Sequence, residues 1–381
     1  MSPTANWSYP TSIRFGAGRI SELPEAVRAA GIARPLLVTD KALAALPITQ
    51  NALDLLDGAG LKPGLFAEVQ SNPTDVNLEA GVAAFREGGH DGVVAFGGGS
   101  GLDLGKCVAF MQGQTRPVWD FEDVGDWWTR ADPDGIAPII AVPTTAGTGS
   151  EVGRAGVITN SADHVKKVIF HPKILPEIVI CDPELTVGMP RFITAGTGMD
   201  AFAHCLEAYC APSYHPMSEG IAIEGMRLVK EYLPRVYATP DDIEARAHMM
   251  SAGAMGAVAF QKGLGAIHAL SHPIGAMHDT HHGMTNAVVM PAVLHANRGA
   301  IEGRIERLAA FLGIAGGFDG FMDFVLSLRA GLDVPPGLIA FGIPETSFDA
   351  IADMAPDDPT AGGNPIKLTR ELAREMVEAA R

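Results

Sequence analysis

The stretch VVAFGGGSGLDLGKCVAF, residues 93–110, decides the fold of the first half of the chain. A short β-rich run is followed by Gly97, Gly98, Gly99 and Ser100, and then by apolar residues at helical spacing. We expect a buried strand, a tight loop and a helix starting near 101–103. Glycines here let the backbone approach a ligand, and the first helical turn offers N–H groups to a phosphate. Because the spacing is not GxGxxG, a plain turn is an equal alternative for this feature alone.

Similar strands flank this unit on both sides. The β-rich runs at 35–40, 137–145 and 177–183 alternate with helix-period segments at 75–88 and 101–112. This order predicts a parallel sheet covered on both faces. After about residue 190 the pattern changes to long apolar-periodic helices. We therefore predict an α/β Rossmann-like domain with a parallel sheet over 1–187 and an all-α domain over 188–381, with the catalytic groups in a cleft between them.

Composition excludes several classes of protein. The net charge of -16 argues against nucleic-acid binding, which needs clustered Lys and Arg. The first residues show no signal-peptide pattern, and no apolar run reaches the roughly 20 residues that span a bilayer, so we expect a cytoplasmic protein without a membrane partner. The four cysteines, Cys107, Cys181, Cys205 and Cys210, have neither disulfide nor zinc spacing and are expected to be reduced and structural.

A second loop with binding potential is PTTAGTGSEVGRAGVIT, residues 143–159. The hydroxyls of Thr144, Thr145 and Thr148 follow a predicted strand, although such hydroxyls can also satisfy their own backbone. Two loops at the carboxyl ends of parallel strands favour a bound cofactor. Asp40, at the end of the strand 35–40, would either bond a ribose 2′-hydroxyl, which favours NAD over NADP, or cap the next helix.

The segment GLGAIHALSHPIGAMHDTHHG, residues 263–283, holds five of the twelve histidines. His268 and His272 are four residues apart, as are Asp200 and His204 upstream, so each pair shares a helix face. With His282 after a turn, these segments could gather one carboxylate and three imidazoles. Such a set suits Fe(II), Zn(II) or Mn(II). Each histidine taken alone is more often a surface or satisfied core residue.

At these residues the chain resembles the iron-containing, or group III, alcohol dehydrogenases. The resemblance covers almost the whole chain, and its landmarks occur in the family's order: FGAG (15–18), VTDKAL (38–43), SNPT (71–74), GGGSGLDLGK (97–106), PTTAGTGSEV (143–152), DP (182–183), GMDAFAHCLEAY (198–209), the histidine segment and NP (364–365). The resemblance implies a Rossmann-like domain followed by a helical domain, a nicotinamide cofactor, a metal bound by one Asp and three His, and a homodimer.

The resemblance also assigns roles to residues of this sequence. The implied metal ligands are Asp200, His204, His268 and His282, and His272 would assist catalysis or proton transfer. Apart from the resemblance, His278 is a candidate proton relay, because an imidazole titrates in the right range. The implied cofactor-binding residues are Asp40, Asn72, Gly98, Gly99, Ser100, Asp103, Thr144, Thr145, Thr148 and Lys167. The chain departs from the family at two positions where proline is common, Gly101 and His281, and the second leaves open whether His281 or His282 is the last ligand.

The resulting hypothesis is an NAD-linked, metal-dependent enzyme that interconverts a primary alcohol and an aldehyde by hydride transfer from a metal-bound alkoxide. Enzyme alternatives are a hydroxy-acid dehydrogenase of the 4-hydroxybutyrate type, a transhydrogenase and a zinc-dependent polyol dehydrogenase. A carboxylate-bearing substrate would need a cation such as Arg154 near the metal. The non-enzyme alternative is a nucleotide or metal binder that has kept the fold.

Overall fold

The computed structural model describes residues 5–7, 11–162 and 165–381, which form two compact units. The first unit comprises residues up to 145 together with 149–188, and the second comprises 146–148 together with 189–381. Among the described residues, no helix is both long enough and apolar enough to cross a membrane.

The first unit is built on a seven-stranded sheet. Its spatial order is β1 (Ala5–Trp7), β2 (Ser12–Phe15), β9 (Ile178–Cys181), β6 (Ile139–Pro143), β5 (Gly92–Gly97), β3 (Pro35–Asp40) and β4 (Gly64–Val69). All neighbouring pairs are parallel except β1 with β2. The expected α/β class with a parallel sheet is therefore confirmed. A separate antiparallel pair, β7 (Ala155–Asn160) and β8 (Val165–Phe170), was not predicted.

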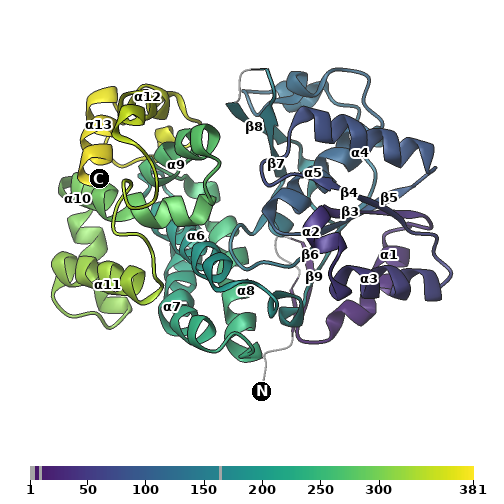
Figure 1. Ribbon diagram of the computed structural model, residues 1–381, viewed down its shortest axis with the longest axis horizontal. Helices are drawn as coiled ribbons and strands as arrows, with labels where there is room; N and C mark the ends of the chain where they lie inside the picture. Colours follow the sequence, from purple (N-terminus) through teal and green to yellow (C-terminus); the bar gives the residue numbers. More distant parts are fainter. Residues whose placement is uncertain (1–4, 8–10, 163–164) are drawn as a thin grey trace. The chain divides into compact units, whose positions relative to one another are not determined.

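Helices cover both faces of this sheet (Figure 1). On one face α1 (Leu23–Ala29) and α3 (Pro47–Gly58) share an apolar core with strand residues such as Val94, Phe96 and Ile140. The opposite face carries α4 (Asp75–Glu87) and α5 (Gly99–Met111), and the short α2 (Lys41–Ala44) follows β3. The near-continuous apolar runs of the sequence predict such strands, which are buried by helices on both faces of the sheet.

The helix after the glycine run begins earlier than expected. We predicted a start at 101–103, but α5 starts at Gly99, and the Leu102 N–H already bonds the Gly98 carbonyl at 3.0 Å. The turn itself is made by Gly97 alone, whose φ of 144° is one that residues with a Cβ rarely adopt. Gly98 is the N-cap, and Gly101 lies where the helix passes close to the preceding strand: a Cβ there would be 3.0 Å from the Phe96 carbonyl oxygen.

The second unit is helical, as expected. Its helices are α6 (Arg191–Cys210), α7 (Pro216–Ala238), α8 (Ile243–Ala259), α9 (Ala266–His278), α10 (His282–Phe311), α11 (Gly317–Gly331), α12 (Phe348–Met354) and α13 (Arg370–Ala379). α6 packs against α7, α8 and α10 and is buried on all sides from Thr194 to its end. Polar side chains on α6 therefore lie inside the unit, where they need partners.

A buried lysine caps the carboxyl end of α6. The Lys262 ammonium donates to the Ala208 and Tyr209 carbonyls at 3.0 and 3.2 Å and also to the Ala211 carbonyl. A cation at this end complements the helix dipole. All four cysteines are buried and unpaired, as reduced structural thiols should be.

Candidate metal centre

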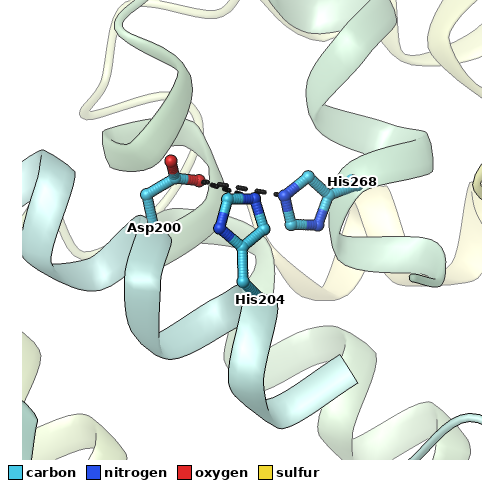
Figure 2. A group of neighbouring side chains, drawn as sticks. All are labelled: Asp200, His204 and His268. Carbon is cyan, nitrogen blue, oxygen red and sulfur yellow. Dashed lines mark ion pairs between the residues drawn. The ribbon is translucent and has the colours of Figure 1, made fainter. Parts of the chain in front are cut away.

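Three histidine side chains of the second unit converge on one carboxylate oxygen, that of Asp200. Asp200 and His204 lie one turn apart on one face of α6, as their spacing predicts. His268 lies in the first turn of α9, and His282 is the first residue of α10. The Nε2 atoms of His204, His268 and His282 are 3.7, 3.8 and 3.6 Å from Asp200 Oδ1. Figure 2 shows the first two rings directed toward the carboxylate.

These distances suit a shared ion better than direct bonding. They exceed the roughly 3.2 Å limit of ordinary N–H···O hydrogen bonds. Two ligand atoms that each lie about 2.1 Å from one ion can be at most about 4.2 Å apart, and all three distances fall within that bound. The donor atoms of Asp200, His204 and His268 lie within 4.8 Å of one another, while His282 stands outside that group although its Nε2 is the nearest to Asp200 Oδ1. One carboxylate and three imidazoles fit a first-row divalent ion.

Burial makes the charges of this site interdependent. Asp200, His204 and His268 are 2%, 5% and 1% exposed. Burial opposes the ionised Asp200, but the surrounding imidazoles hold the pKa of its carboxyl well below its usual value. Burial lowers the pKa of His204 to about 4, whereas for His268 the nearby carboxylates of Glu207 and Asp200 outweigh burial and raise the pKa to about 9. A buried anion surrounded by ring nitrogens is an arrangement that a cation would stabilise.

The two adjacent histidines before and at the start of α10 have different surroundings. The Nδ1 of His281 accepts from the Met284 backbone N–H at 3.3 Å, so His281 is the N-cap of the helix. Its ring meets Phe192 edge to face. His282, one residue later, directs its Nε2 toward Asp200. The geometry favours His282 over His281 as the fourth ligand.

His272 lies beside these residues and is held by a carboxylate. Its ring stacks on that of His282, with centroids 5.3 Å apart. Its Nδ1 lies 2.8 Å from Asp358 Oδ2, which leaves Nε2 as the free ring nitrogen for a proton. His278, the last residue of α9, has a different partner, since its Nε2 lies 2.9 Å from the Ser347 hydroxyl.

In the first unit, the two predicted cofactor loops lie next to each other. They follow the neighbouring parallel strands β5 and β6, and the Thr144 N–H donates to the Gly97 carbonyl at 2.9 Å. The methyl of Thr145 lies 3.1 Å from where a Cβ on Gly98 would stand. Within the described ranges, no side chain caps α5 and the buried hydroxyl of Thr144 has no hydrogen-bond partner. An uncapped helix N-terminus beside an unpartnered hydroxyl fits a nucleotide phosphate.

Several other predicted cofactor residues have partners within the protein. The pairs are Asp40 with the Leu43 N–H, Ser100 with the Ser71 carbonyl, Asp103 with the Ser150 hydroxyl, and Lys167 with Glu122. Asp40 thus caps α2, one of its two expected roles, and its ribose contact stays a prediction. Gly99 is the first residue of α5, Asn72 lies on the bend between β4 and α4, and Thr148 belongs to the second unit.

Comparison with known families matches both halves of the chain. The family model described as "Iron-containing alcohol dehydrogenase" matches residues 10–183, and "Fe-containing alcohol dehydrogenase family, C-terminal" matches residues 194–381. The chain belongs to the iron-containing alcohol dehydrogenase family. The resemblance inferred from the motifs is confirmed.

Individual relatives match the chain along almost its full length. A 4-hydroxybutyrate dehydrogenase from Cupriavidus necator is 40% identical over 97% of this chain and 98% of that protein. An NAD-dependent methanol dehydrogenase from Bacillus methanolicus is 32% identical, with 98% and 99% covered. The crystal structure of a 1,3-propanediol oxidoreductase superposes with a TM-score of 0.93 at 32% identity, and both chains are covered in full. The expected oxidoreductase class is confirmed.

Sequence reasoning missed a buried amide in the candidate metal centre. The Nδ2 of Asn286 donates to Asp200 Oδ1 at 2.8 Å and lies 3.3 Å from the Nε2 atoms of His268 and His282. Its Oδ1 is buried and has no hydrogen-bond partner in the part of the chain that the structure describes. Asn286 follows His282 by four residues on α10, so helical spacing could have found it.

Two carboxylates that contact the site histidines were also missed. Glu207 Oε2 lies 2.6 Å from Nδ1 of His268, and Asp358 contacts His272 as described above. Glu207 is three residues after His204 on α6, again a helical spacing. Asp358 is 86 residues from its partner, and no local pattern points to it.

The second cofactor loop also holds a buried carboxyl, Glu151, which is 4% exposed. Burial raises its pKa to about 7, although its own backbone N–H and Lys106 favour the charged form. Between the ordinary value of 4.5 and about 7, the folded protein keeps a proton that the unfolded chain has lost. The free energy of unfolding should therefore fall as pH rises through this window, and the contribution is fully lost above it.

Glu151→Gln should remove this pH-dependent loss. Relative to the unmodified protein, the variant is expected to gain up to about 3 kcal/mol in the free energy of unfolding between about pH 4.5 and about pH 8. Denaturant unfolding at a series of pH values measures the difference. An identical pH dependence in the two proteins would contradict the assignment.

Proposed function

We propose that this oxidoreductase interconverts a primary alcohol and its aldehyde, with NAD as the cofactor and Fe(II) held by Asp200, His204, His268 and His282. One observation carries the proposal: three imidazole Nε2 atoms lie 3.6–3.8 Å from Asp200 Oδ1, farther away than ordinary hydrogen-bond length. An ion beside the buried Asp200 oxygen would have one carboxylate and up to three imidazoles within reach as ligands.

The proposed tasks divide between the bound groups and the chain. When bound, the ion supplies Lewis acidity toward the alcohol or carbonyl oxygen, and the nicotinamide accepts or returns the hydride. His272 would accept the hydroxyl proton at Nε2, because Nδ1 is engaged by Asp358. Its side chain is 25% exposed, so the proton can pass to solvent, with His278 kept as the predicted relay.

The proposal of NAD rests on three observations. The uncapped N-terminus of α5 and the Thr144 hydroxyl fit a dinucleotide phosphate, and the methanol dehydrogenase relative is NAD-dependent by name. In addition, the carboxylate of Asp40 at the end of β3 would repel a 2′-phosphate. Steady-state rates with NAD and NADP under identical conditions test this directly, and a higher kcat/KM with NADP would overturn it.

The experiment that tests the function is a substrate panel. Anaerobically purified protein is assayed for NADH formation with straight-chain primary alcohols, with the matching secondary alcohols as controls, and for NADH consumption with the aldehydes. We expect turnover of primary alcohols and aldehydes. If no alcohol, aldehyde or hydroxy acid is turned over, the proposed reaction is wrong, and the result favours a nucleotide or metal binder without catalytic activity.

A second candidate function is the oxidation of 4-hydroxybutyrate. It is favoured by the 40% identity to a 4-hydroxybutyrate dehydrogenase, against 32% to the methanol dehydrogenase. Arg154, the cation considered for a carboxylate, lies over the Phe170 ring at 5.5 Å in the first unit. Comparing 4-hydroxybutyrate with 1,4-butanediol, which differs only at the far end, decides between the two: a much higher kcat/KM for the acid would identify a hydroxy-acid dehydrogenase.

Asp358→Asn should slow turnover without removing the metal. The carboxylate accepts from His272 and also from the Thr360 backbone N–H and hydroxyl, so it is held in place. An amide can present a donor to His272 and so allow the wrong tautomer. We expect kcat to fall roughly 10–100-fold with metal content unchanged. Asp357→Asn, an exposed neighbour, is the matched control; equal kcat in both variants would rule out this role for Asp358.

The metal, the assembly and the location are also part of the proposal. Fe(II) is preferred, with Zn(II) and Mn(II) as alternatives, and metal analysis of anaerobically purified protein distinguishes them. The homodimer, tested by light scattering, and the cytoplasmic location stay predictions.

A further inference from the structure

Glu207 connects the helix that carries two candidate ligands to the helix that carries a third. Asp200, His204 and Glu207 follow one another at four and then three residues along α6, so they share one face. Across from them, α9 begins at Ala266. Glu207 is 7% exposed and directs both of its carboxylate oxygens at this helix start.

The two oxygens have different partners. Oε1 accepts from the Ile267 backbone N–H at 2.6 Å, and Oε2 lies 2.6 Å from His268 Nδ1. An ionised carboxylate only accepts, so Nδ1 of His268 must carry a proton. In the neutral ring, which is the form that can ligate a metal, the unprotonated nitrogen is then Nε2, which lies 3.8 Å from Asp200 Oδ1 and 3.3 Å from the Asn286 amide.

We propose that Glu207 is a positioning residue of the metal centre: it holds His268 in the tautomer and orientation in which Nε2 can ligate, and so raises metal affinity. The inference rests on the metal site put forward under Proposed function. Carboxylates that accept from the outer nitrogen of a ligating histidine typically contribute about 10–100-fold to metal affinity. Glu207 itself does not reach the substrate or the ion in this account.

A purely structural role for Glu207 needs to be separated from this one. The start of α9 has a second cap, Asn364, whose Oδ1 accepts from the Ala266 N–H at 3.2 Å. Asn364 also exchanges two hydrogen bonds with Asn297, at 2.8 and 3.0 Å. Asn364 therefore stabilises the same helix end, and among the described residues its hydrogen bonds do not include one to His268. Asn364→Ala is the matched control for loss of helix capping.

Two substitutions of Glu207 separate the hydrogen bond from the charge. Glu207→Gln keeps the size of the side chain, but its amide has one oxygen to accept from two donors, the Ile267 N–H and the His268 ring. If the oxygen accepts from Ile267, the amide NH₂ faces His268 Nδ1. The NH₂ then favours the histidine tautomer that carries its proton on Nε2. Glu207→Asp keeps the charge but is one methylene too short to hold both contacts. Both variants should therefore weaken metal binding if the contact to Nδ1 is what matters.

The test measures metal retention by the zinc-loaded protein. The unmodified protein and the variants E207Q, E207D, N364A and H268A are equilibrated with graded chelator, and bound zinc per chain is measured by mass spectrometry; thermal unfolding is recorded alongside. We expect roughly 10–100-fold weaker zinc binding in E207Q and E207D, a much smaller change in N364A despite its lower melting temperature, and no retained zinc in H268A.

Each other outcome has a defined meaning. Zinc affinity equal to that of the unmodified protein in E207Q would overturn the positioning role and leave the metal centre standing. If zinc affinity is lost in E207Q but kept in E207D, Glu207 acts only through its negative charge, and the positioning role is also overturned. If N364A loses as much zinc as E207Q, the effect is helix capping and the inference is wrong. If the unmodified protein retains no zinc at this site, the metal centre itself fails, and this inference with it.

Discussion

Replacing His268 with alanine is expected to remove the metal and the turnover together. The ring is 1% exposed, with Nδ1 beside Glu207 and Nε2 facing Asp200, so alanine removes the only imidazole that α9 directs at this carboxylate among the described residues. The loss should exceed the roughly 10–100-fold effect typical of residues outside the ligand shell, because a ligand itself is removed. Metal per chain and NADH formation are measured on the same preparation.

The control for His268→Ala is His295→Ala. His295 lies on α10 but is exposed, so its loss should leave both metal content and turnover at the level of the unmodified protein. Thermal unfolding of both variants checks that the fold persists. Full metal content in folded His268→Ala would show that this imidazole is not a ligand.

The second large effect is expected from Gly283→Ala, which forces α10 away from α6. A Cβ at this position would lie 2.1 Å from the Gly196 carbonyl oxygen and 2.8 Å from the Asp200 Cβ. No side-chain rotation relieves a clash with backbone, so the helices must separate, and His282, the preceding residue, moves with α10. We expect a loss of about 3 kcal/mol or more in the free energy of unfolding, at the upper end of overpacking effects, and a loss of bound metal.

Gly299→Ala provides the comparison on the same helix. A Cβ on Gly299 would meet nothing within 4 Å. Alanine is favoured over glycine inside a helix by about 1 kcal/mol, so this variant should be as stable as the unmodified protein or slightly more stable. Denaturant unfolding and metal analysis of the two variants measure the difference. Similar results for both would refute the close helix contact as the cause.

The sequence predicted the regular part of the fold because its patterns are local. Apolar runs at 35–40 and 92–98 became β3 and β5, since buried parallel strands need continuous apolar residues. The early start of α5 was missed because glycines are poor helix formers, and the close passage of the strand at Phe96 is not visible in sequence. β7 was missed because a loop was assigned through residue 159.

The grouping of residues at the candidate metal centre was predictable to the extent that they repeat at helical spacing. Asp200 and His204 followed from that spacing, and Glu207 and Asn286 could have followed from it too. Asp358 could not, because its contact with a histidine 86 residues away depends on tertiary packing. Which of the two adjacent histidines caps α10 also required the structure, since only the backbone path shows it; His282 as the last ligand stays a prediction.

The central claim is that one divalent ion, held by Asp200 and three histidines, is required for alcohol oxidation. The most direct measurement follows metal content and NADH formation in one anaerobic preparation, before chelation, after chelation, and after Fe(II) is added back. The account predicts about one ion per chain at the start, parallel loss of the ion and of turnover, and recovery of both with Fe(II). Full turnover by protein from which the metal has been removed would contradict it.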